Sequence, residues 1–147
     1  MECPKNAWLK KHKPDVFYIN ELTEFEKAII ETGNEVELAA RKLFPTGALI
    51  AGRDEQARRQ TAELIGAREQ TMFQPVFLKD GFLAAIDVLQ YDKKIDSYSI
   101  IEIKASNEIK TDWHPQDLAF QVSLLRRCGI VVSKACIMHL NPDYVRS

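Results

Sequence analysis

The chain has 147 residues, the length of one ordinary domain. Hydrophobic residues make up 46% and charged residues 28%, which excludes a disordered tail, a collagen-like repeat and a disulfide-dense small protein. Twenty basic against twenty-one acidic residues give a net charge of −1, so bulk charge does not make the chain bind nucleic acid. Such a role needs a local basic patch or a metal ion.

The sequence predicts a cytoplasmic protein without a membrane partner. No run of about 18 apolar residues could span a bilayer, and the polar N-terminus has no signal-peptide core. Cys3, Cys128 and Cys136 are odd in number and widely spaced, as thiols of a reducing compartment are. Without repeats or a linker, residues 1–147 are expected to form a single domain. The abrupt ends suggest a fragment of a longer polypeptide.

The first half is predicted to be helical. Residues 4–11 can form a short helix. Apolar residues recur every three or four positions over about 23–44, which predicts a long amphipathic helix. Thr23 and Glu26 have the spacing of a capping box at its start. Asp54 can cap a third helix over about 55–65.

The second half is predicted to alternate between strands and turns. Strands are expected over residues 73–78, 82–91, 98–104 and 130–140, with one helix over about 115–128. The strand–helix–strand step at the end predicts a parallel pair. The expected fold class is therefore α/β, with a mixed sheet flanked by helices.

Three charged residues interrupt these apolar strands. Asp87 lies in the second strand, and Glu102 and Lys104 lie in the third. Charges inside apolar strands are costly unless they are used. Because side chains alternate along a strand, Glu102 and Lys104 point to one face.

The hairpin register predicts that two of these charges meet. If the turn is centred between Lys94 and Ile95, Tyr91 pairs with Tyr98 and Asp87 faces Glu102. Opposed carboxylates repel unless a proton or a cation lies between them. A hard divalent cation prefers such oxygen ligands, and the Ile103 carbonyl could add a third. A solvated strand face is the structural alternative.

The order of short motifs resembles the PD-(D/E)-x-K nuclease superfamily. Asp87 followed by Glu102-Ile103-Lys104 matches its signature. Residues 32–37 (TGNEVE) resemble the conserved helix of RecB-type and CRISPR-associated exonuclease domains, and residues 117–121 (DLAFQ) resemble their later helix. Cys3-Pro4-Lys5 resembles their start. The chain is most similar to an uncharacterised bacterial family with a RecB-like nuclease domain at its N-terminus.

This resemblance implies a restriction-endonuclease-like fold and a metal-dependent site. Asp87 and Glu102 would be ligands of Mg²⁺ or Mn²⁺, and Lys104 the catalytic lysine. Glu37 stands where the family often has histidine, and Glu35 is a competing candidate. Gln121 matches the glutamine of the later helix, although the expected aromatic four residues on is Leu125, and Ile86 replaces the motif's proline.

Further contacts are expected around this site. Lys110 and Arg126 are candidates for binding the substrate backbone, together with Gln121. The resembling exonucleases often hold an iron–sulfur cluster, and Cys3 matches its first ligand. Because Cys128 and Cys136 fit a core better, no iron–sulfur cluster is expected in this chain alone.

The sequence therefore predicts a deoxyribonuclease domain that hydrolyses phosphodiester bonds with Mg²⁺ or Mn²⁺. DNA is the expected partner, with the rest of a longer polypeptide or a helicase or repair protein as further partners. One alternative is a nuclease-fold module that binds DNA or a protein without cutting. Another is a structural domain of a larger assembly.

Overall fold

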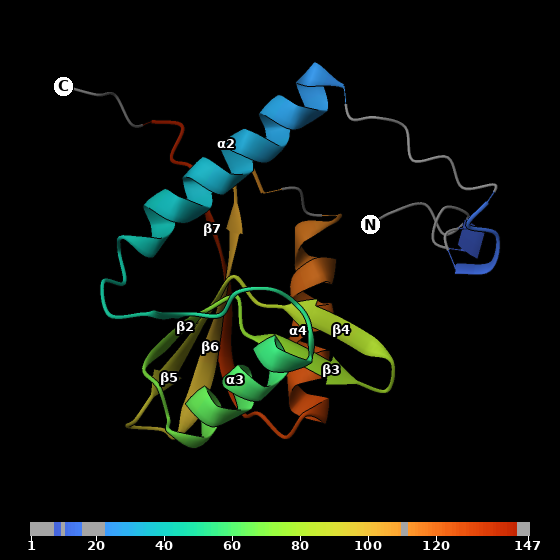
Figure 1. Cartoon of the computed structure of the whole chain (residues 1–147). Coiled ribbons are helices and arrows are strands. Elements are labelled where there is room, and N and C mark those ends of the chain that lie inside the picture. The colour runs from blue at the N-terminus through green and yellow to red at the C-terminus, as the bar shows by residue number, and fades with distance from the viewer. Residues whose placement is uncertain (1–7, 10, 16–22, 110–111, 144–147) are drawn as a thin grey trace. The chain divides into compact units, whose positions relative to one another are not determined.

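The computed structural model describes residues 8–9, 11–15, 23–109 and 112–143. The chain divides into two compact units, residues 1–32 and 33–147, and the boundary falls within the first long helix. Within the described part of the chain, no helix is long and apolar enough to cross a membrane. The elements labelled in Figure 1 are, in order, α2 (Glu24–Arg41), β1 (Ala48–Leu49), α3 (Glu55–Gly66), β2 (Thr71–Phe73), β3 (Val76–Lys79), β4 (Phe82–Ala85), β5 (Val88–Asp92), β6 (Ser97–Lys104), α4 (His114–Arg127) and β7 (Val132–His139).

The second unit is built on a five-stranded mixed sheet, as the α/β prediction expected. The strand order is β1-β2-β5-β6-β7, and β3 pairs with β4 in a separate hairpin. Strand β5 runs antiparallel to β2 and β6, whereas β1–β2 and β6–β7 are parallel pairs. The predicted parallel pair on either side of the last helix is confirmed, with α4 as the crossover.

The predicted helix starts are confirmed by their caps. The Thr23 backbone N–H donates to Glu26 Oε2 at 2.8 Å, and the Glu26 N–H donates to Thr23 Oγ1 at 3.2 Å, which closes the capping box of α2. The Asp54 carboxylate accepts from the Ala57 N–H at 2.9 Å at the start of α3. The helix expected over residues 4–11 lies mostly outside the described residues.

Two of the predicted strands are each divided into two shorter strands, so the prediction of continuous strands was wrong. The run 73–78 is divided into β2 and β3 at Gln74-Pro75, because Gln74 has φ +55° and proline cannot donate to a ladder. The run 82–91 is divided into β4 and β5 at Ile86-Asp87. The Ile86 N–H donates to the Pro75 carbonyl at 3.0 Å, so the two breaks lie side by side.

The sheet buries apolar side chains on both faces. The larger cluster joins the sheet to α3 and α4, and its fully buried members include Met72, Leu89, Ile100, Leu124 and Leu125. The alternate residues Phe73, Val88 and Ile101 form a second cluster on the other face. Cys128 packs against the first cluster and Cys136 against the second. The interruption between β4 and β5, near the end of β6, therefore lies next to buried apolar side chains on both faces of the sheet.

Candidate metal and catalytic site

Asp87 occupies the interruption between β4 and β5. The predicted hairpin register is confirmed by the Tyr91–Tyr98 pair, but the ladder ends at Val88–Ile101. The expected pairing of Asp87 with Glu102 is therefore not part of the ladder. The chain bends into β4 instead, and Asp87 Oδ2 accepts a hydrogen bond of 2.7 Å from the Ile103 N–H. The carboxylate thus replaces the backbone partner that β6 has lost.

Glu102 and Lys104 lie two residues apart on β6 and contact each other, as strand alternation predicted. Lys104 Nζ donates to Glu102 Oε1 at 2.7 Å and lies 3.9 Å from Asp117 Oδ2. Gln121 Nε2 donates to Glu102 Oε2 at 2.6 Å. Asp117 and Gln121 are one helical turn apart, so the same face of α4 supplies both contacts.

Glu37 joins the site through a glutamine. Its Oε1 accepts from Arg41 Nη2 at 2.5 Å and from Gln74 Nε2 at 2.6 Å. The same Gln74 nitrogen lies 3.2 Å from Asp87 Oδ1. Glu35, the competing candidate, is exposed and lines an apolar groove with Met138. Of the two acids, Glu37 is the one that approaches Asp87.

The surroundings raise the pKa values of both Asp87 and Lys104. Burial, followed by the charges of Glu102 and Glu37, raises the pKa of Asp87 from 3.8 to about 6, although hydrogen bonds from Ile103 and Gln74 oppose this. Burial lowers the pKa of the Lys104 ammonium, but its hydrogen bond and charge pairing with Glu102 outweigh this and leave the pKa raised. Lys104 therefore stays protonated at neutral pH.

The donor set and the charge of the site fit a hard divalent cation. Glu37, Asp87 and Glu102 bring three carboxylates, against the two cations Arg41 and Lys104. The Ile103 carbonyl lies on the same edge of β6 as the N–H that contacts Asp87, because both groups of one strand residue point to one side. Oxygen ligands of this kind suit Mg²⁺ and Mn²⁺.

The positions of these side chains, by contrast, do not form a ligand set for a metal ion. Among the described residues, no three His, Cys, Asp or Glu side chains are grouped to hold a metal ion. Both oxygens of Glu102 accept from neighbouring side chains. Gln121 is only 8% exposed, and its Oε1 is buried without a hydrogen-bond partner. An ion would therefore require side chains in this cluster to turn.

Of the remaining predicted contacts, only Arg126 lies within the described residues, and it is not part of this cluster. Arg126 lines a groove of about 680 Å³ with Leu118 and Val122 of α4 and Ile137 of β7. Lys110 and Cys3 lie outside the described residues. Sequence reasoning missed Gln74 and Arg41. The Gln74-Pro75 dipeptide inside an apolar run was the available signal for the bend that places Gln74.

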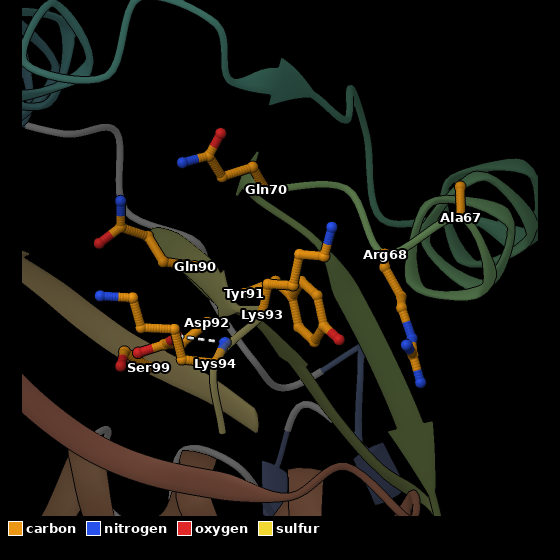
Figure 2. A pocket seen from close by; sticks show the side chains of 9 residues that line it. All are labelled: Ala67, Arg68, Gln70, Gln90, Tyr91, Asp92, Lys93, Lys94 and Ser99. Carbon is orange, nitrogen blue, oxygen red and sulfur yellow. Dashed lines mark hydrogen bonds between the residues drawn. The ribbon is translucent and has the colours of Figure 1, made fainter. Parts of the chain in front are cut away.

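A larger cavity lies away from these acids. It has a volume of about 740 Å³, and Figure 2 shows Arg68, Lys93 and Lys94 among its lining side chains. Gln90 and Ser99, a cross-strand pair of β5 and β6, also line it. Gln90, the β5 lining residue nearest to Asp87 in sequence, is roughly 10 Å from it along the strand at 3.3 Å per residue. The size of the cavity does not make it part of the acid cluster.

Comparisons of the chain with protein-family models, with curated proteins and with solved structures gave no match.

Proposed function

We propose that the second unit is a metal-dependent nuclease domain that hydrolyses DNA phosphodiester bonds with Mg²⁺ or Mn²⁺. The observation that carries the proposal is the approach of Glu37 and Glu102 to the partly buried Asp87, which is costly to ionise there, together with the pairing of Glu102 with Lys104. The motif order of the nuclease superfamily in the sequence supports the same reaction.

Each residue has a distinct role in this proposal. Asp87, Glu102, Glu37 and the Ile103 carbonyl would hold the ion. A bound divalent ion lowers the pKa of a water molecule and stabilises negative charge on a phosphate. Lys104, cationic through its contact with Glu102, orients the water or offsets charge on the phosphate rather than acting as a base. The buried amide of Gln121 fixes the Glu102 carboxylate.

One observation favours a second function, a non-catalytic module that binds DNA or a protein. Lys104 and Gln121 engage both oxygens of Glu102, so the carboxylate can serve as a purely structural ion pair. The two proposals differ in what a metal ion does. The nuclease needs the ion for cleavage, whereas the module binds its partner without it.

Incubation with linear and circular, single- and double-stranded DNA tests the proposal. We expect cleavage in Mn²⁺, none in EDTA, and a loss of at least about 100-fold in Asp87→Ala. Glu37→Ala should lose activity, whereas its exposed neighbour variant Glu35→Ala should cut at the wild-type rate. Equal losses in the two glutamate variants would reject the assignment of Glu37. An intact substrate in every mixture would favour the non-catalytic module.

A further inference from the structure

Gln74 is fixed in place beside Asp87 by the backbone. It lies at the bend between β2 and β3 with φ +55°, a left-handed conformation that is unfavourable for a non-glycine residue. Its N–H donates to the Asp87 carbonyl at 3.3 Å, and the following Pro75 carbonyl accepts from Ile86. The bend therefore holds the Gln74 side chain at the acid cluster.

The side-chain nitrogen of Gln74 lies between two acids from distant parts of the sequence. Nε2 is 2.6 Å from Glu37 Oε1 and 3.2 Å from Asp87 Oδ1. A point within hydrogen-bonding reach of two carboxylates attracts positive charge, and an amide NH₂ supplies only the partial charge of its two donors.

On the basis of the proposed nuclease function, we propose that Gln74 is a further ligand of the divalent cation. Half a turn of the terminal amide exchanges Nε2 for Oε1 with little movement of other atoms. Without the ion, an amide oxygen facing Glu37 and Asp87 would be repelled, so the NH₂ group lies inward. With the ion between them, the oxygen joins the two carboxylates as a hard ligand.

The unused acceptor of Gln121 supports a ligand in this cluster independently of the acids. This side chain is more than nine-tenths buried on the Glu102 side, and its Oε1 has no hydrogen-bond partner. A buried acceptor without a donor is unfavourable unless a ligand, a water or an ion satisfies it. The site therefore contains, besides its carboxylates, a hydrogen-bond acceptor that has no partner among the described residues.

Mn²⁺ binding to the full chain, measured by calorimetry without DNA, tests the proposal. Gln74→Leu removes the oxygen at similar volume and should weaken Mn²⁺ affinity about tenfold or more. Gln74→Glu keeps an oxygen and should bind at least as tightly as wild type. Gln70→Leu makes the same change at the remote cavity and should leave the affinity unchanged.

Different outcomes would contradict the ligand role of Gln74 alone or the metal site as a whole. If Gln74 merely bridges the two acids, removing it increases their repulsion, and Gln74→Leu binds Mn²⁺ as well as wild type or better. That result overturns the ligand role and leaves the nuclease proposal standing. Should Gln74→Leu fail to fold, weaker binding by Gln74→Glu overturns it instead. A wild-type chain that binds no Mn²⁺ up to about 10 mM overturns both proposals.

Discussion

Asp87 is held where its negative charge is unfavourable to the fold. Burial and the charges of Glu102 and Glu37 raise its pKa to about 6, while the Ile103 N–H retains the side chain in place. A shift of this size corresponds to about 3 kcal/mol between the two protonation states. Because the pKa is raised on folding, the folded chain binds a proton more readily than the unfolded one. The penalty is complete above about pH 6 and fades as the pH falls towards 4.

Asp87→Asn should therefore stabilise the metal-free protein by about 1–3 kcal/mol at pH 7.5. The neutral amide can still accept from the Ile103 N–H, but it loses part of the contact with Gln74, which limits the gain. Urea denaturation at pH 7.5 and pH 4.5 measures the difference. The advantage should shrink at the lower pH, where wild-type Asp87 is protonated. A less stable variant at pH 7.5 would contradict the burial of an unbalanced charge.

The sequence was sufficient to predict the relative positions of site residues that lie on one strand. Glu102 and Lys104 share a face because they are two positions apart, and that prediction needed no tertiary information. Gln74 could not be found in this way. Its contacts with Glu37 and Asp87 depend on a left-handed bend and on the placement of α2, neither of which hydrophobic periodicity encodes.

At the scale of the elements, one hydroxyl ties α3 to the strand that follows the Gln74 bend. Thr61 is 2% exposed, and its Oγ1 donates to the Ala57 carbonyl at 2.8 Å. The same oxygen accepts from the Val76 N–H at 2.9 Å. Strand β3 is thereby attached to α3 rather than continuing the ladder of β2. The predicted unbroken strand over 73–78 failed because this attachment and Pro75 outweigh the strand propensity of the run.

Thr61→Val should destabilise the fold by about 1–3 kcal/mol, because it keeps the shape but leaves the buried Val76 N–H without an acceptor. Thr61→Ser keeps the hydroxyl and loses only a methyl group, so its loss should be smaller. Thermal or urea denaturation of both variants gives the comparison. A serine variant that is less stable than the valine variant would show that packing, rather than this hydrogen bond, holds α3 to β3.

At the scale of the whole molecule, the candidate site draws on segments spread through the second unit. Glu37, Gln74, Asp87, Glu102 and Gln121 come from α2, the β2–β3 bend, the β4–β5 bend, β6 and α4. The α/β class, the mixed sheet and the parallel crossover followed from the order of strand and helix patterns. The turn between β3 and β4 was expected, but the two-residue strand β1 and the separation of the β3–β4 hairpin from the main sheet were not predicted, since both depend on tertiary pairing.

We propose that this cluster catalyses metal-dependent hydrolysis, and substitution of Lys104 separates catalysis from metal binding. Lys104→Met keeps the apolar stem and removes the charge, whereas Lys94→Met makes the same change in the remote β5–β6 turn. The measurement is the rate of DNA cleavage at saturating Mn²⁺, with Mn²⁺ affinity checked in parallel. We predict that wild type and Lys94→Met cut at the same rate. Lys104→Met should still bind Mn²⁺ but cut at least about 100-fold more slowly. A Lys104→Met variant as fast as wild type would exclude a catalytic role for Lys104, and a wild-type chain that binds Mn²⁺ and cuts no DNA would exclude the nuclease function.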